Sequence, residues 1–140
     1  MKHDLFSNIK PQVALDFGTI STDTTTAGNI IDTQGFQSVV FGIITGTVTD
    51  GDYTILIQDG DESNLSDAAN VADAYLRGTE AGASFTADTD DDKISKIGYI
   101  GIKRYVRMSI VSTNTSSGAV IGGYAILGNP IVAPDTTQTR

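Results

Sequence analysis

The sequence predicts an all-β protein with a jelly-roll-like β-sandwich fold in a single domain. Apolar residues alternate with a period of two in several short segments, and turn residues separate these segments. Gly and Thr are plentiful, with 15 Gly in 140 residues, and one stretch alone has helical composition. A chain of this length buries roughly two-thirds of its unfolded surface. With no cysteine, it must fold without disulfides.

Three segments are expected along the chain. These are an N-terminal arm over residues 1–11, the sandwich domain over residues 12–128 and a C-terminal tail over residues 129–140. The arm and the tail lack a hydrophobic period, so neither buries enough apolar area to offset its ordering entropy. We therefore expect both to be flexible in the free protein.

The first half of the domain contains three predicted strands. Residues 12–20 alternate apolar and polar side chains, which indicates a strand with one wet face. Residues 36–49 are apolar on both faces in the middle, as in an interior strand. The sequence Asp50-Gly51-Asp52 predicts a hairpin leading into a strand over residues 53–58, because Gly adopts the positive φ of tight turns.

The second half is organised around a predicted central strand over residues 98–112. Its even positions are mostly apolar and its odd positions are cationic, aromatic or hydroxylic. Residues 59–76 form at most one or two helical turns, and residues 78–92 form an acidic surface connection. The apolar stretch 119–127 is expected to pair with the central strand. The predicted core consists of Val13, Leu15, Phe17, Val40, Ile44, Ile55, Ile57, Ile100, Val106, Met108, Ile110, Ile121 and Ile126.

Charge is distributed unevenly along the chain. The net charge is −8, which disfavours direct binding to nucleic acid phosphates. Twelve of the 17 acidic residues lie between positions 50 and 92, and five of the nine basic ones lie between positions 93 and 107. No signal peptide or long apolar run is present, so neither secretion nor a membrane partner is expected.

Catalytic and metal-binding patterns are weak. The one histidine, His3, lies in the arm, and no glycine cluster has the Lys and Ser or Thr of a phosphate-binding loop. Residues 88–92 contain four aspartates, which either bind Ca²⁺ or form a solvated acidic loop. Asp59, Asp61 and Glu62 are a weaker Ca²⁺ candidate. A paired-carboxylate glycosidase is possible, but the chain has no Trp for a sugar platform. We expect no enzyme activity and no cofactor.

Four residues near position 105 are the candidate interface: Lys103, Arg104, Tyr105 and Arg107. In one interpretation they form a basic strand face that pairs with nearby aspartates. In the other they contact a partner protein, because Tyr and Arg are enriched at protein interfaces. Arg104, at an otherwise apolar position, suggests a bulge or the end of the buried section.

Four segments in order resemble a family of small tailed-bacteriophage capsid decoration proteins, also called cement proteins. They are Gly-Thr-Val-Thr-Asp-Gly-Asp-Tyr-Thr at 46–54, Gly-Thr-Glu-Ala at 78–81, Gly-Tyr-Ile-Gly-Ile-Lys-Arg-Tyr-Val-Arg at 98–107 and Ala-Ile-Leu-Gly-Asn-Pro at 125–130. The resemblance spans roughly residues 29–134 and brings no catalytic residues.

The resemblance implies a jelly-roll-like structural protein of the virion. Such a protein is made in the bacterial host cytoplasm, binds the outer capsid surface and ties neighbouring major capsid protein subunits together. A homo-oligomer, dimer or trimer, is expected on the capsid. The alternative function is that of a phage tail or fibre domain that binds a host glycan, and an enzyme ranks third.

Overall fold

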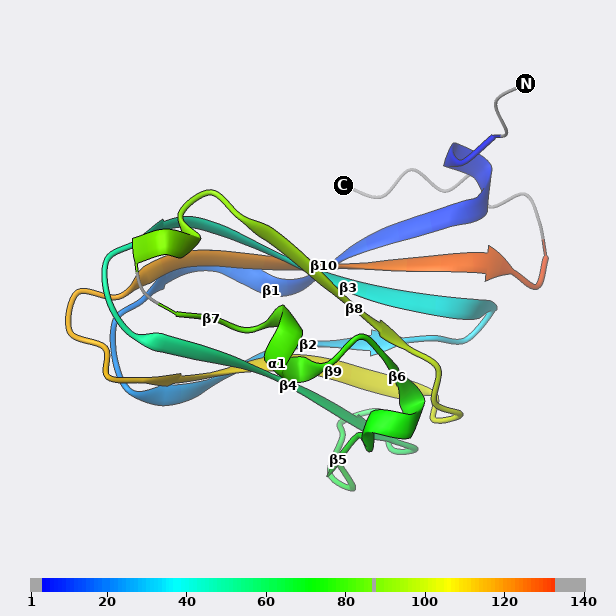
Figure 1. Cartoon of the computed structure of the whole chain (residues 1–140). Coiled ribbons are helices and arrows are strands. Elements are labelled where there is room, and N and C mark those ends of the chain that lie inside the picture. Colours follow the sequence, from blue (N-terminus) through cyan, green and yellow to red (C-terminus); the bar gives the residue numbers. More distant parts are fainter. Residues whose placement is uncertain (1–3, 87, 133–140) are drawn as a thin grey trace.

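Two antiparallel sheets pack face to face in the computed structural model, which describes residues 4–86 and 88–132 (Figure 1). Sheet A contains, in spatial order, β1 (Ile9–Ile20), β10 (Ala119–Pro130), β3 (Phe36–Val48), β8 (Ile94–Tyr99) and β6 (Leu76–Arg77). Sheet B contains β2 (Thr24–Asp32), β9 (Tyr105–Thr113), β4 (Asp52–Gly60) and β5 (Ala69–Asn70), and β7 (Phe85–Thr86) also pairs with β4. The predicted all-β sandwich is confirmed.

The helices are single turns. They are η1 (Phe6–Asn8), η2 (Asp73–Tyr75), α1 (Glu80–Ala83) and η3 (Asp88–Asp90). Among the described residues, no helix has the length and apolarity needed to span a bilayer.

The chain alternates between the two sheets at almost every connection. Apart from β4 and β5, consecutive strands lie in different sheets, so that β1-β10-β3-β8 faces β2-β9-β4-β5. This is the strand arrangement of a jelly roll, as predicted. Each long strand is therefore paired with strands distant in sequence, as β1 pairs with β10.

Two predicted pairings are wrong because of this alternation. Asp50-Gly51-Asp52 joins β3 of sheet A to β4 of sheet B and is not a hairpin, although Gly51 does have a positive φ of 99°. Residues 119–127 pair with β1 and β3 and not with residues 98–112. The hairpin signal reports the turn residue correctly, but it does not distinguish a turn within one sheet from a crossing between two.

The predicted single strand over residues 98–112 is also wrong. β8 ends at Tyr99 in sheet A, and β9 begins at Tyr105 in sheet B, with residues 100–104 crossing between them. A Cβ added at Gly101 would lie 2.4 Å from the Tyr99 ring, so the chain turns closely over that ring. The alternation of apolar residues through the crossing is fortuitous, since Ile100 and Ile102 are exposed.

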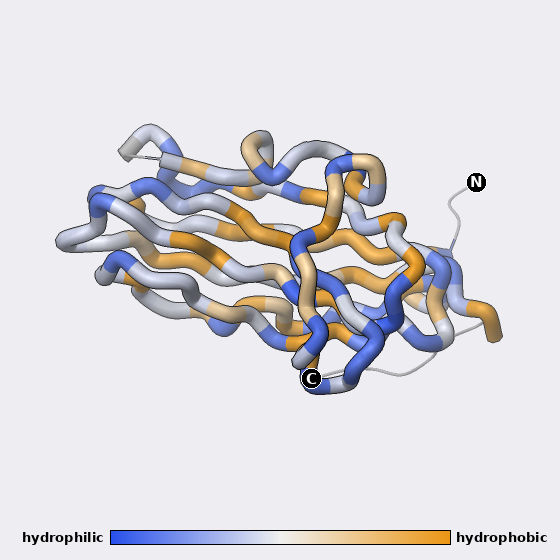
Figure 2. The backbone as a smooth tube through the Cα atoms, turned by 90° about the horizontal axis from the view of Figure 1, so that it is seen from below, coloured by the Kyte–Doolittle hydropathy of each residue, from blue (hydrophilic) through white to orange (hydrophobic). Residues whose placement is uncertain are grey.

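The core lies between the sheets, and Figure 2 shows hydrophobic residues along the middle of the strands. Seven predicted core residues are buried: Leu15, Ile55, Ile57, Val106, Met108, Ile110 and Ile121. Val40 and Ile126 are half-buried, whereas Val13, Phe17, Ile44 and Ile100 are exposed. In β1 the pairing register shifts on both sides of Leu15, so Ala14 and Leu15 both point inward and the period of two fails.

The edge of β4 is covered by the segment around α1. Thr79 caps α1 by accepting a hydrogen bond from the Gly82 N–H at 2.9 Å. The Glu80 carboxylate then accepts from the Ile57 N–H at 2.7 Å, and the Ser84 hydroxyl accepts from the Ile55 N–H at 2.9 Å. These side-chain oxygens thus accept hydrogen bonds from backbone N–H groups that would otherwise be unpaired at an open strand edge.

The predicted arm and tail boundaries are wrong by a few residues. Residues 9–11 belong to β1, and residues 129–130 belong to β10, where Pro130 is opposite Phe36. The Ile131 N–H donates to the Gly35 carbonyl at 2.8 Å. Residues 1–3 and 133–140, for which flexibility was predicted, lie outside the described residues.

Replacing Val106 by Asp should abolish folding. Val106 in β9 has no exposed surface, and burying an unpaired carboxylate costs several kcal/mol against a total stability of about 5–15 kcal/mol. Val111→Asp, five residues further along β9 and on its half-buried outer side, is the matched control. Circular dichroism melting should show a cooperative transition for Val111→Asp alone, and a cooperatively melting Val106→Asp protein would contradict the assigned face.

Candidate interaction surfaces

The four predicted interface residues do not lie on one strand face. Lys103 and Arg104 belong to the 100–104 crossing, whereas Tyr105 and Arg107 lie on β9 and point away from the core. The Arg104 Cζ is 5.0 Å from the centre of the Tyr105 ring, a cation–π contact. The structure thus brings three of the four together at one end of the sandwich, and Arg107 is further along β9.

The cationic groups of this segment are already paired within the chain. Arg104 donates two hydrogen bonds to the Asp32 carboxylate, at 2.9 and 2.8 Å, and Lys103 forms an ion pair with Asp61. Arg107 donates to Gln58 on β4 at 2.9 Å. Two of these three cations thus pair with carboxylates, those of Asp32 and Asp61 and not those of residues 88–92, and they do so from the crossing and not from a strand face.

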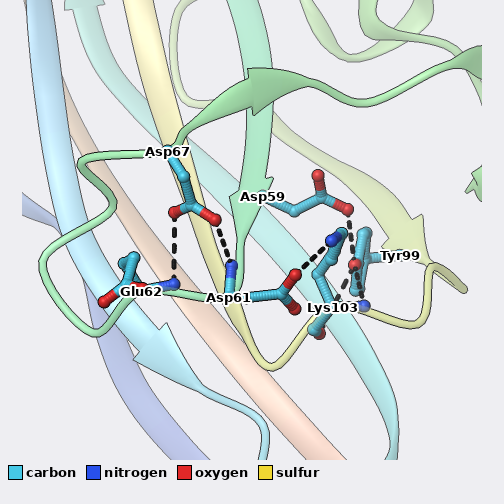
Figure 3. Close-up of polar contacts among 6 residues, drawn as sticks. All are labelled: Asp59, Asp61, Glu62, Asp67, Tyr99 and Lys103. Atoms are coloured by element: carbon cyan, nitrogen blue, oxygen red, sulfur yellow. Dashed lines mark hydrogen bonds and ion pairs between the residues drawn. The ribbon is translucent and has the colours of Figure 1, made fainter.

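Tyr99 forms hydrogen bonds that hold the crossing in place (Figure 3). Its hydroxyl donates to Asp59 at 2.7 Å and accepts from the Lys103 N–H at 3.1 Å. Burial raises the pKa of Tyr99, and the hydrogen bond to Asp59 raises it further. The two hydrogen bonds of the hydroxyl hold the crossing against β4.

Asp67 fixes the acidic loop next to the crossing (Figure 3). Its carboxylate accepts from the Asp61 N–H at 2.7 Å and from the Glu62 N–H at 3.1 Å. The first of these hydrogen bonds is the main cause that lowers the pKa of Asp67. Of the weaker Ca²⁺ candidate, Asp61 and Glu62 thus belong to a hydrogen-bonded loop in which Asp61 pairs with Lys103, whereas Asp59 lies on β4 and accepts from Tyr99.

Exposed apolar residues gather at this same end of the sandwich. The end is formed by η1, the β2–β3 turn, the β8–β9 crossing and the last residues of β10 (Figure 1). A surface hollow of about 430 Å³ lies between the β2–β3 turn and residues 130–132. The exposed fractions are 66% for Leu5, 62% for Phe6, 45% for Ile100, 92% for Ile102, 66% for Ile131 and 83% for Val132. We call these six residues the apolar end.

Aspartates fasten the opposite end. Asp50 accepts from the Ser117 N–H at 2.9 Å, the Gly118 N–H at 2.8 Å and the Ser116 hydroxyl at 2.6 Å. Asp23 accepts from the N–H of Thr115 at 2.8 Å. These hydrogen bonds, the one from the Ser116 hydroxyl first, hold the pKa of Asp50 far below its ordinary value. The β9–β10 connection is thereby held against the β3–β4 connection.

Replacing Asp50 by Asn should lower the melting temperature by several degrees at pH 7. The ionised form of Asp50 stabilises the fold above its ordinary pKa of 3.8, and that stabilisation is lost as pH falls below this value. The difference from wild type should therefore shrink in acid. Asp73→Asn removes the same charge from an exposed residue, and an equal effect of both variants would assign the loss to net charge and not to the hydrogen bonds.

Two of the aspartates in residues 88–92, Asp90 and Asp91, accept hydrogen bonds from the backbone. Asp91 accepts from the Val48 N–H at 2.6 Å, and the Asp90 carboxylate accepts from the Thr86 N–H at 2.8 Å. Within residues 4–86 and 88–132, no group of three His, Cys, Asp or Glu is arranged to hold a metal ion. His3 lies outside the described residues.

A ligand that binds only the folded state stabilises that state by mass action, so its removal lowers the melting temperature. We expect no bound Ca²⁺, and addition of a Ca²⁺ chelator should therefore leave the melting temperature unchanged. Asp91→Asn should lower the melting temperature equally with and without chelator, since it weakens the hydrogen bond to Val48. A drop of several degrees in wild type on chelation would instead indicate a bound cation.

A second apolar surface, on the outer face of sheet A, was missed by the sequence analysis. Val13, Phe17 and Ile44 were assigned to the core, yet 60%, 69% and 42% of their surface is exposed. The signal that indicates this face is the glycines at positions 42 and 122, which lie on neighbouring strands among large apolar residues. Such glycines accommodate rings that lie flat on a sheet.

Comparison with family models, curated proteins and solved structures finds no match for this chain.

Proposed function

We propose that this chain is a structural virion protein that binds the outer surface of a phage head and cements neighbouring major capsid protein subunits. The observation that carries the proposal is the apolar end, which has the ion pairs of Lys103 and Arg104 next to Ile102 at the β8–β9 crossing. Exposed apolar residues accompanied by charged ones are common in protein-binding surfaces. The residues that first suggested an interface, Lys103, Arg104 and Tyr105, lie at this crossing.

The resemblance to decoration proteins supports the same proposal through the roles of the resembling segments. Gly51 turns the β3–β4 connection, Thr79 caps α1 and Gly101 turns the β8–β9 crossing. Three of the four segments thus supply residues that this sandwich needs at its connections. A shared set of connection residues favours a shared fold, and the proposed function follows from the family that the segments resemble.

Binding to phage heads should require the apolar end. Ile102→Glu places a charge on a side chain that is 92% exposed, so folding should be unaffected while binding to heads that lack this protein falls at least tenfold. Thr22→Glu, in the connection at the opposite end, is the matched control and should bind as wild type does. Co-sedimentation with purified heads measures both, and equal binding of the two variants would contradict the proposed surface.

Copy number separates the proposed function from a glycan-binding fibre domain. A cement protein should be present in hundreds of copies per virion, in fixed ratio to the major capsid protein on a stained gel. A fibre domain should give a few dozen copies at most, and that result would overturn the proposal.

A further inference from the structure

A hollow of about 450 Å³ lies on the outer face of sheet A, where β1, β10 and β3 are neighbouring strands. Its lining residues are Val13, Leu15, Asp16, Phe17, Ile44, Gly122, Gly123 and Tyr124. None of the six residues of the apolar end lines it. The hollow is therefore a separate site from the surface on which the proposed function depends.

Two aromatic rings form part of the lining, and glycines let both lie against the sheet. A Cβ added at Gly42 would lie 2.2 Å from Cζ, 2.5 Å from Oη and 2.7 Å from Cε1 of Tyr124, so this ring lies across Gly42. A Cβ added at Gly122 would lie 2.4 Å from Cδ2 of Phe17. Phe17 is 69% exposed and Tyr124 is half-buried, so both rings present surface to a ligand in the hollow.

A carboxylate stands beside these rings. Among the described residues that line the hollow, Asp16 is the only one with a charge. Its Oδ1 accepts a hydrogen bond from the Asn29 side chain at 3.0 Å, and its Oδ2 has no partner in the described part of the chain. Lys96 lies in the same cross-strand row as Tyr124, with Gly42 between them, but it does not line the hollow. The carboxylate can therefore pair with a cation from outside the chain.

We propose that this hollow binds a basic side chain, Arg or Lys, of a partner protein. The face of an aromatic ring attracts a cation, and the planar Arg side chain also stacks on such rings. The aliphatic stem of either side chain would contact Val13 and Ile44 while its charge pairs with Asp16. The net charge of −8 attracts a basic partner before contact is made.

Other classes of ligand fit this lining less well. A purely apolar side chain would bury the Asp16 carboxylate without a partner, which is unfavourable. An anion would be repelled by the same carboxylate. A sugar carries several hydroxyl groups that need hydrogen bonds when buried, and Tyr124 provides the only other polar side chain of the described lining. Charge and lining together therefore select a cation with an apolar stem.

A second hollow continues the first and indicates that the cation belongs to a peptide segment. Val13 and Tyr124 line both hollows. The second has a volume of about 550 Å³, and its other lining residues are Pro11, Gln12, Asn29, Ile30 and Ile31. A small free cation would leave this second hollow empty, whereas residues that flank an Arg or Lys in an extended segment would occupy it. The inference goes beyond the proposed function, because the site would take a basic segment of any partner protein.

Titration of the full chain with an acetylated and amidated Gly-Gly-Arg-Gly-Gly peptide at low salt tests the proposal. In amide NMR spectra, the signals of Leu15, Gly122 and Gly123 should shift, with a dissociation constant in the millimolar range for a single side chain. The same peptide with citrulline, a neutral residue of nearly the shape of Arg, should bind about fivefold more weakly. Equal binding of the two peptides, or no shift at these amides, would overturn the proposal.

Variants of the lining give a second test with the same Arg peptide. Asp16→Asn and Phe17→Leu should each weaken binding about fivefold, and both should fold, because both side chains are exposed. Asp73→Asn removes the same charge outside the hollow and should bind as wild type does. Equal weakening by Asp16→Asn and Asp73→Asn would assign the attraction to net charge and contradict the site.

Two further measurements separate this site from the other proposals. Ile102→Glu, which should lose binding to phage heads, should bind the Arg peptide as wild type does, because Ile102 does not line the hollow. A failure of head binding and a failure of the hollow are thus distinguishable. Shifts of the same amides by a methyl glycoside, with none by the Arg peptide, would assign the hollow to a glycan and overturn the proposed cation site.

Discussion

Hydrogen bonds from backbone N–H groups to aspartate carboxylates are the interaction on which this sandwich depends. Because the chain crosses between the sheets at almost every connection, the connecting segments cannot satisfy their N–H groups within a hairpin. Asp50 accepts three of these groups at one end of the molecule, and Asp67 accepts two near the other. The acidity of the chain is therefore in large part structural, and much of it is not available for a ligand.

This use of carboxylates explains why the acidic clusters were hard to interpret from sequence. Asp90 and Asp91 are adjacent in the sequence, but each accepts a hydrogen bond from a backbone donor on a different strand. Whether such aspartates bind a metal or accept hydrogen bonds from a loop depends on the distances between backbone donors in space. Those distances are set by strands that are remote in sequence. The spacing of aspartates along the chain contains no information on them.

The fold class was predictable because period-two alternation and turn residues act locally, and residues such as Ile55 and Met108 follow that alternation into the core. The strand predictions were wrong where the alternating pattern continued through a crossing between the sheets or was interrupted by a bulge. Residues 98–112 keep their alternation through the β8–β9 crossing, and β1 loses its alternation at the bulge beside Leu15. Of the candidate interface, residue types near position 105 were predictable, whereas the apolar end was not, because its residues come from both terminal segments and from the β8–β9 crossing.

Gly42 and Gly122 of sheet A determine how two aromatic rings lie on its outer face. A residue larger than Gly at position 42 or 122 would displace the ring of Tyr124 or Phe17, and the displaced ring would stand out from the sheet. Free energy of folding alone does not favour Gly in a central strand, because Gly increases the entropy lost on folding. These two positions instead provide the space in which the Tyr124 and Phe17 rings lie against the sheet. Phe17, which the sequence pattern places in the core, therefore lies outside it, with 69% of its surface exposed.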